Sequence, residues 1–378
     1  MEEINQEIGT LLEDALRKLP PPNAEKLRHS VELLRKAEKL ALSYDEENGY
    51  YLAFSGGKDS QCLWHVARMA GVRFKAHMSL TSVDPPEVIR FVKREYPDVE
   101  LIKPGKSMFR KAVELKLLPS MKVRWCCKEY KEGAGAGKVT LIGIRHAEST
   151  RRSKRNEVEI SAETRSRRYS GDLDGLDGFR KEKSKEKRGR KPAGYKEVNI
   201  TNADGERVLG CIRGKESLLI SPIIEWTDEE VWTFLDVIGA RHCELYDEGW
   251  KRIGCIGCPM SSQRHKMEEN ERWPHVRRNW IKAIREIRKM GLGGVRYEMR
   301  ERNRGLYVNY KAMTAEFLPR DVSIKASGQV FLDGSSSDRL TEEQENEIAE
   351  NIYDWWISGK PYRKWYAERF CQGKLEFE

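Results

Sequence analysis

Six consecutive residues, Ser55 to Ser60, have the types and the order needed to bind a phosphate group. They read Ser-Gly-Gly-Lys-Asp-Ser, follow the short apolar and aromatic run Tyr50–Phe54, and precede Gln61–Met69, whose apolar residues have helical spacing. A strand, a glycine turn and a helix N-terminus form an anion site together, because free backbone N–H groups and the positive end of the helix dipole face the ligand. The two adjacent glycines allow close approach of the backbone to a phosphate, and Lys58 adds a cation. The spacing differs from that of the Walker loop, which has four residues between its first glycine and its Gly-Lys pair.

Four of the cysteines stand in two close pairs, and these pairs are typical of a metal centre. Cys126 and Cys127 are adjacent, and Cys255 and Cys258 enclose two residues, one of which is Gly257. Adjacent cysteines do not easily ligate one zinc ion together, but they can reach two iron atoms of one cluster, and four thiolates are what a [4Fe–4S] cluster needs. Zinc and a redox dithiol at the second pair remain alternatives.

Composition and charge narrow the class of protein. The chain has 378 residues, of which 39% are hydrophobic and 34% charged. No apolar run approaches the roughly 18 residues of a membrane span, and the acidic start is not a signal peptide, so we expect a cytoplasmic protein without a membrane partner. In that compartment the cysteines are expected to serve metal binding or catalysis rather than disulfides.

Positive charge is concentrated in one segment. The chain carries a net charge of +9, and residues 151–197 contain 16 Lys/Arg and 9 Asp/Glu, so 16 − 9 = +7 of that charge lies there. This concentration indicates a polyanionic partner such as a nucleic acid. The alternative is a solvated loop that binds nothing in particular.

The pattern of elements predicts an α/β fold, with a Rossmann-like parallel sheet, helices on both of its faces, and helical N- and C-terminal extensions. We expect a helical extension over residues 1–48, broken at Pro20–Pro22, a catalytic domain over 49–265, and a mainly helical region over 266–378. The expected strands are Tyr50–Phe54, Val72–Leu80, Val99–Lys103 and Lys138–Ile144, and regular structure is expected to resume at Leu218–Ile224. The expected helices are Gln61–Ala70, Pro86–Glu95, Lys106–Leu117, Thr227–Val237, Trp273–Met290 and Thr341–Trp356.

Two local features refine this outline. Residues 164–196 are rich in glycine and charge and poor in apolar residues, so we expect an exposed, irregular insertion there. Thr227 is a good N-cap, and Glu230 three residues later completes a capping box.

Five motifs in order resemble the phosphoadenosine phosphosulfate (PAPS) reductase family, which belongs to the superfamily of PP-loop ATP pyrophosphatases and adenine nucleotide alpha hydrolases. They are Ser55–Ser60, Arg124–Lys128, Gly143–Arg152, Pro222–Trp232 and Leu245–Pro259. Ser55–Ser60 corresponds to the PP-loop.

The resemblance implies the roles of particular residues. The nucleotide would be bound by Ser55, Gly56, Gly57, Lys58, Asp59, Ser60 and Gly143. The catalytic candidates are Lys58, Asp59, Arg145 and Arg152; the arginines would bind phosphate or sulfate, and Asp59 would hold Mg²⁺ directly or through water. For Glu148, the alternative to a role in the reaction is an ion pair with one of these arginines.

The resemblance leaves the reaction open. We expect an enzyme that binds ATP and cleaves it to AMP and pyrophosphate, activating a target for sulfur transfer as in DNA phosphorothioation or tRNA thiolation. A sulfur donor protein such as a cysteine desulfurase would be its partner. The alternatives are a sulfonucleotide reductase that makes sulfite and a non-catalytic nucleic-acid-binding member of the family. Reductases use a cysteine near their C-terminus, but the neighbours of Cys371 do not match that tail motif.

Overall fold

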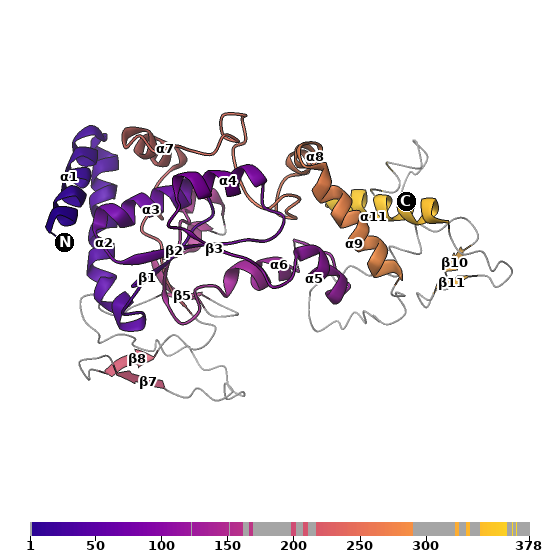
Figure 1. The fold of residues 1–378 in the computed structure, drawn as a ribbon, viewed down its shortest axis with the longest axis horizontal. Helices are drawn as coiled ribbons and strands as arrows, with labels where there is room; N and C mark the ends of the chain where they lie inside the picture. Colours follow the sequence, from indigo (N-terminus) through magenta and orange to yellow (C-terminus); the bar gives the residue numbers. More distant parts are fainter. Residues whose placement is uncertain are drawn as a thin grey trace. The chain divides into compact units, whose positions relative to one another are not determined.

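The structure is a computed structural model that describes most of the chain. The described residues are 2–121, 123–150, 152–161, 166–168, 198–201, 207–210, 217–289, 322–324, 330–332, 341–360, 365 and 368 (Figure 1). The chain divides into two compact units. The first comprises Met1–Leu80, Pro86–Lys103 and Lys131–Ile253, and the second comprises Thr81–Pro85, Pro104–Tyr130 and Gly254–Glu378. The predicted boundaries at residues 48 and 265 stay predictions.

The first unit is built on a mostly parallel sheet, which confirms the predicted α/β class. Within the described residues the sheet has seven strands in the order β3-β2-β1-β4-β9-β5-β6. The first five in this order run parallel, whereas β5 is antiparallel to both β9 and β6. The strands are β1 (Tyr50–Ala53), β2 (Phe74–Ser79), β3 (Glu100–Ile102), β4 (Val139–Leu141), β5 (Val158–Ser161), β6 (Ser166–Arg168) and β9 (Ser217–Ile220).

The order of these strands reverses direction at β1. From β1 the chain proceeds outward to β2 and β3, and it then returns to place β4 on the other side of β1. Such a reversal is a topological switch point, and ligands of open parallel sheets bind there, outside the carboxyl ends of the strands. The glycine turn after β1 and Gly143 after β4 both lie at this point of the topology.

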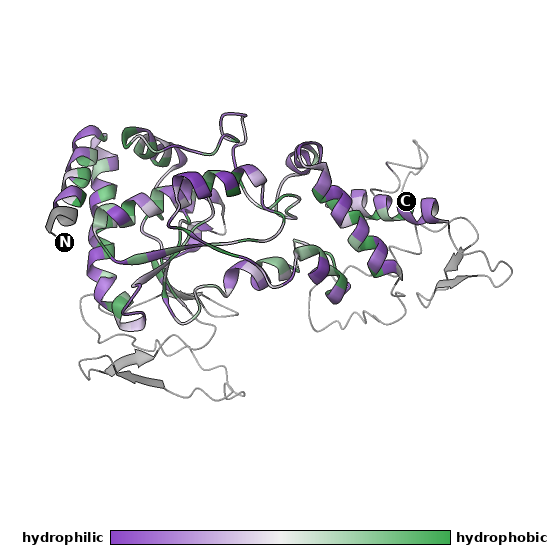
Figure 2. Cartoon of the chain, in the orientation of Figure 1, coloured by the Kyte–Doolittle hydropathy of each residue, from purple (hydrophilic) through white to green (hydrophobic). Residues whose placement is uncertain are grey.

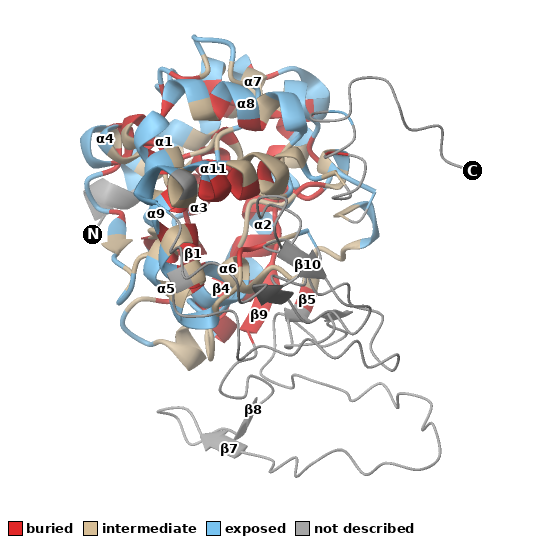
Figure 3. Ribbon diagram, turned by 90° about the vertical axis from the view of Figure 1, so that its right-hand side faces the viewer, coloured by how far each residue is buried: buried red, intermediate tan, exposed pale blue. Residues whose placement is uncertain are grey.

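Helices pack along the sheet of the first unit. They are α1 (Glu2–Lys18), α2 (Pro21–Tyr44), α3 (Lys58–Ala70), α4 (Pro86–Glu95) and α7 (Asp228–Val237), with 3₁₀ turns η2 (His146–Glu148) and η3 (Arg152–Lys154). In α2, apolar residues at helical spacing such as Leu27, Leu34 and Ala37 are fully buried. Figure 2 shows hydrophobic and hydrophilic residues alternating along this helix, and Figure 3 colours the buried parts of the chain red. The Tyr50 hydroxyl donates to the carbonyl oxygen of Leu34 at 2.6 Å, which ties α2 to β1.

The second unit is mainly helical in its described residues. It contains α5 (Met108–Leu115), α6 (Trp125–Cys127), α8 (Gln263–Arg272), α9 (Pro274–Lys289) and α11 (Glu342–Ser358), and the π-helix η1 (Lys128–Glu132) starts in it. Trp280 of α9 is 1% exposed and packs against Phe109 and Trp356, with ring centroids 4.9 and 5.0 Å away. The helix α8 was not predicted, because its residues are nearly all polar and give no apolar periodicity. The hairpin β10–β11 (Val322–Ile324 and Val330–Leu332) also belongs to this unit.

One expectation about the insertion is wrong. Residues 166–168 fall inside the segment predicted to be irregular, yet they form β6 and pair with β5. The backbone pairing of Ile160 with Arg167 extends the sheet although the segment lacks apolar periodicity. Residues 169–197 lie outside the described part, whereas β7 (Val198–Thr201) and β8 (Arg207–Gly210) form a separate hairpin. Among the described helices, none combines the length and the apolar character needed to cross a bilayer.

Candidate functional site

The glycine turn after β1 has the backbone geometry of an anion-binding loop. Gly56 has a φ of +74°, and a Cβ at this position would lie 2.6 Å from Val88 and 2.9 Å from Val92 of α4. Only glycine therefore fits here. Gly57 is the N-cap of α3 and has no side chain that could accept a hydrogen bond from the first N–H groups of the helix.

Buried polar side chains hold the loop in this shape. The Ser60 hydroxyl donates to the Gly57 carbonyl at 2.8 Å and accepts from the Ser55 N–H at 3.2 Å. The fully buried Gln61 donates to the Gly56 carbonyl at 3.1 Å, and its own amide oxygen accepts from the Tyr96 hydroxyl at 3.1 Å. The loop is thus fixed before any ligand binds, which reduces the entropy lost on binding.

Two cations and two carboxylates form one network beside the loop. The Lys58 ammonium lies 3.3 Å from Asp59 and 3.1 Å from Asp228. Arg145 is 1% exposed; it donates to Asp59 at 2.8 Å, to the Trp226 carbonyl at 3.2 Å and to Asp228. The formal charges of these four side chains sum to zero, so the positive potential that remains comes from the N-terminus of α3.

The network also shifts the pKa values of its members. Burial raises the pKa of Asp228, but hydrogen bonds from Arg145 and Lys58 outweigh burial and leave the pKa below its usual value. Burial lowers the pKa of Arg145, and the attraction of Asp59 and Asp228 more than compensates, so its pKa is raised. Asp228 therefore stays ionised at neutral pH, and Arg145 stays protonated.

Three further predicted residues surround the network. A Cβ on Gly143 would lie 2.9 Å from the carbonyl oxygen of Asp59, so the segment after β4 touches the first turn of α3. Arg152 pairs with Glu148, and the other carboxylate oxygen of Glu148 accepts from the Arg145 N–H at 2.8 Å. The plainer alternative for Glu148, an ion pair with one of the arginines, is confirmed.

Two residues of this site escaped the sequence analysis as functional residues. Asp228 follows the capping residue Thr227 on α7, and Tyr246 accepts the Lys58 N–H at 2.9 Å. Both residues lie within motifs that resemble the family, and this position in the motifs could have identified them as functional candidates. Their partners are far away in sequence, so spacing could not reveal the contacts.

The four paired cysteines all belong to the second unit. A hydrogen bond with Cys127, burial, and then the charges of Cys127, Cys255 and Cys258 raise the pKa of the Cys126 thiol, so Cys126 interacts with all three other thiols. Thr81 lies 3.5 Å from the Cys255 sulfur. Within the described residues, no three His, Cys, Asp or Glu side chains converge tightly enough to hold a single metal ion.

Side chains outside the pairs support the two cysteine segments. Arg124 donates to the Cys127 sulfur at 3.1 Å. Gly257, with a φ of +71°, donates its N–H to Glu269 at 2.8 Å, and Glu269 is 2% exposed. Burial raises the pKa of Glu269 to about 7. The donor set of four thiols suits an iron–sulfur cluster better than a single hard cation.

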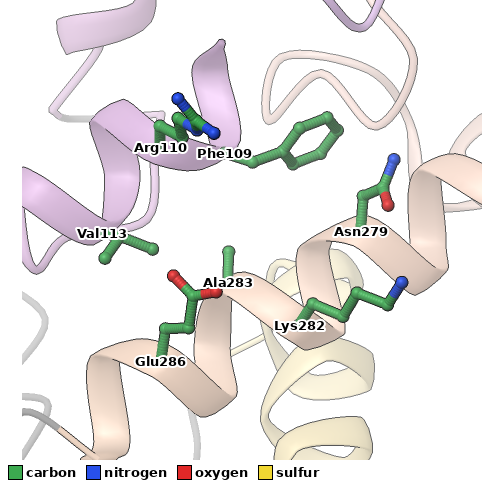
Figure 4. Close-up of a pocket in the computed structure, with 7 residues that line it drawn as sticks. All are labelled: Phe109, Arg110, Val113, Asn279, Lys282, Ala283 and Glu286. Carbon is green, nitrogen blue, oxygen red and sulfur yellow. The ribbon is translucent and has the colours of Figure 1, made fainter. Parts of the chain in front are cut away.

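The second unit also contains a small cavity of about 260 Å³ between α5 and α9. Figure 4 shows the side chains around it, which combine apolar residues with exposed charges of both signs. They are Phe109, Arg110, Val113, Asn279, Lys282, Ala283 and Glu286. The cavity contains none of the predicted site residues.

A glycine turn with the backbone geometry of an anion site, at the switch point of a mostly parallel sheet, gives the chain a Rossmann-like nucleotide-binding fold. The model of the phosphoadenosine phosphosulfate reductase domain matches residues 49–261, and the chain belongs to this family.

Individual relatives are more distant. An uncharacterized protein from Methanocaldococcus jannaschii is 24% identical over 272 residues, which cover 69% of this chain and 56% of that protein. An adenosine 5'-phosphosulfate reductase from Staphylococcus epidermidis is 40% identical over 43 residues, which cover 11% of this chain and 18% of the enzyme. The chain thus spans little more than half of the first relative and less than a fifth of the second. A solved structure of Candida glabrata FMN adenylyltransferase aligns with a TM-score of 0.39 at 11% identity over 68% of this chain and 72% of that one.

Proposed function

We propose that the chain is an ATP pyrophosphatase that activates a target for sulfur transfer. The observation that carries the proposal is the preformed loop Ser55–Ser60, which presents the N-terminus of α3 beside Lys58 at the switch point. In the proposed reaction an oxygen of the target attacks the α-phosphorus of ATP. The bond from that phosphorus to the α–β bridging oxygen breaks, and its electron pair leaves with pyrophosphate.

The residues of the loop fit this chemistry. Its backbone N–H groups and Lys58 would stabilise the charge that builds on the leaving pyrophosphate, which is usually the largest catalytic contribution. Arg145 would act as a positioning residue, because its guanidinium is committed to Asp59 and Asp228. The side-chain charges of the network balance, so a polyphosphate needs further positive charge. Mg²⁺ would supply it at the phosphates, with Asp59 as the nearest carboxylate in sequence.

Release of pyrophosphate tests the proposal directly. Purified protein is incubated with ATP and Mg²⁺ alone and with DNA, tRNA or adenylyl sulfate. We expect release to depend on a nucleic acid and to fall about a hundredfold or more in Lys58→Ala. Lys75→Ala is the matched control, because Lys75 pairs with Glu100 at 2.9 Å on the strands β2 and β3. Sulfite formation from adenylyl sulfate without pyrophosphate release from ATP would instead favour the reductase.

We propose further that Cys126, Cys127, Cys255 and Cys258 hold one [4Fe–4S] cluster. The support is the interaction of Cys126 with the other three thiols. A cluster spreads its ligands over several iron atoms, so its thiolates need not converge on one point as those of a zinc ion must. Anaerobically purified protein should be brown and contain about four irons per chain. Stoichiometric zinc without iron would contradict this assignment.

A nucleic acid is the proposed target because of the charge of residues 151–197, with 16 Lys/Arg against 9 Asp/Glu. Several phosphate contacts would make binding fall steeply with salt. Binding to DNA and to tRNA is measured at two salt concentrations, with the full chain and after deletion of residues 165–196. Unchanged binding and an unchanged salt slope after the deletion would refute the role of this segment. In the proposed reaction the sulfur would come from a donor protein such as a cysteine desulfurase.

A further inference from the structure

The hydroxyl of Tyr246 accepts the first N–H group of α3. Lys58 is the first residue of this helix, and its N–H donates to the Tyr246 hydroxyl at 2.9 Å. The same hydroxyl oxygen would lie 3.5 Å from a Cβ on Gly57, so it sits directly beside the turn. A phosphate bound at the N-terminus of α3 needs this N–H as a donor. Tyr246 therefore occupies the place of one phosphate oxygen.

Neighbouring residues determine the position of the Tyr246 ring and the protonation of its hydroxyl. The Trp232 ring packs edge-on against Tyr246, with centroids 4.9 Å apart and an interplanar angle of 88°. Burial raises the pKa of Tyr246, and the nearby Asp59 and Asp228 add to the shift, so the hydroxyl is protonated at neutral pH. Among the described residues none accepts a hydrogen bond from it, and its own proton is available to a ligand.

We propose that Tyr246 is a phosphate-binding residue of the nucleotide site. This inference rests on the proposed ATP site and adds a contact to it. A phosphate oxygen is a stronger acceptor than a neutral hydroxyl, so it displaces Tyr246 from the Lys58 N–H. The hydroxyl then donates its proton to the same phosphate, since a phosphate oxygen accepts more than one hydrogen bond. Tyr246 thus changes from an acceptor in the empty site to a donor in the filled one, and it favours ligands that carry a phosphate at the loop.

Calorimetric titration of Tyr246→Phe with ATP, pyrophosphate and adenosine, each with Mg²⁺, tests this role. The variant keeps the ring that packs on Trp232 and removes only the hydroxyl. We expect the Kd values for ATP and pyrophosphate to rise about tenfold or more, the loss that accompanies one hydrogen bond to a charged group. The Kd for adenosine should not change. Tyr50→Phe is the matched control, because it removes the hydroxyl of another tyrosine of the same unit, which donates to the Leu34 carbonyl and lies outside the loop.

The outcomes separate this inference from the proposed function. Unchanged Kd values for ATP and pyrophosphate in Tyr246→Phe overturn the phosphate contact and leave the ATP site intact. Tighter binding overturns it too, because the hydroxyl would then only compete with the ligand. Wild-type protein that binds neither ATP nor pyrophosphate overturns the proposed function and this inference with it. Thermal melts of both variants establish that each is folded at the titration temperature.

Discussion

A single methyl group added at Gly143 should disturb the nucleotide site without changing any charge. The Cβ of Gly143→Ala would lie 2.9 Å from the carbonyl oxygen and 3.1 Å from the carbonyl carbon of Asp59, and 3.4 Å from the Ser60 nitrogen. These are backbone atoms of the first turn of α3, so no flexible side chain can move aside. The segment after β4 or the start of α3 must shift instead.

The size of the effect follows from the contacts. Overpacking of this kind costs about 1–3 kcal/mol. Replacing glycine by alanine also restricts the unfolded chain, which stabilises the fold by about 0.4–1 kcal/mol. We therefore expect the free energy of unfolding of Gly143→Ala to fall by about 0–2.6 kcal/mol, and to lie about 1–3 kcal/mol below that of a glycine-to-alanine variant without the clash. If the shift occurs at α3, the affinity for pyrophosphate should fall about tenfold, because the donors of the loop lose their alignment.

Urea unfolding and calorimetric titration measure the two effects. Gly133→Ala is the matched control in the same unit, because a Cβ at Gly133 has nothing within 4 Å. This variant restricts the backbone of the unfolded chain to the same extent as Gly143→Ala does. The difference between the two variants therefore isolates the clash. Equal stability and equal pyrophosphate affinity in the two variants would refute the close packing of Gly143 on α3.

Two more predictions concern the surroundings of the loop. Burial lowers the pKa of His65 to about 4, so the unfolded chain takes up a proton before the native state does as the pH falls. The protonation of His65 should therefore lower the free energy of unfolding of the wild type by about 2 kcal/mol between pH 7 and pH 5. In urea titrations over the same pH range, the free energy of unfolding of His65→Phe should fall by about 2 kcal/mol less than that of the wild type. Asp228→Asn removes a partly exposed negative charge beside Lys58, and we expect pyrophosphate to bind about two- to fivefold more tightly at low salt. Asp236→Asn, an exposed position on the same helix, should leave the calorimetric Kd unchanged, and an equal gain in both variants would contradict the local role of Asp228.

Local chemistry made much of this fold predictable. The bounds of α4, Pro86–Glu95, agree with the expected helix, and the capping box of Thr227 and Glu230 forms as expected. Such features depend on neighbours within one turn. The antiparallel β5 was not predicted, because its pairing with β9 joins Val158 to Ile220 and depends on contacts distant in sequence. Periodicity carries no information about such pairs.

The candidate site also combines features that the local sequence predicts with contacts that are distant in sequence. The glycine turn could be identified from six consecutive residues, since its chemistry is local. The contact of Tyr246 with Lys58 spans 188 residues, so it depends on the tertiary fold rather than on local sequence. For Arg145 the family resemblance implies a phosphate ligand, whereas its burial and its bonds to Asp59 and Asp228 favour the positioning role proposed above.

The balance of charge beside the loop has a consequence for how the proposed site would bind anions. Lys58 and Arg145 are each paired with carboxylates, so the side chains add little net positive potential. The affinity for a phosphate must then depend largely on backbone N–H groups, whose contribution requires accurate alignment. Residues that shape the loop without charge, such as Gln61 through its bond to the Gly56 carbonyl, should therefore matter for affinity as much as the lysine does. Sequence comparison by charge alone would overlook them.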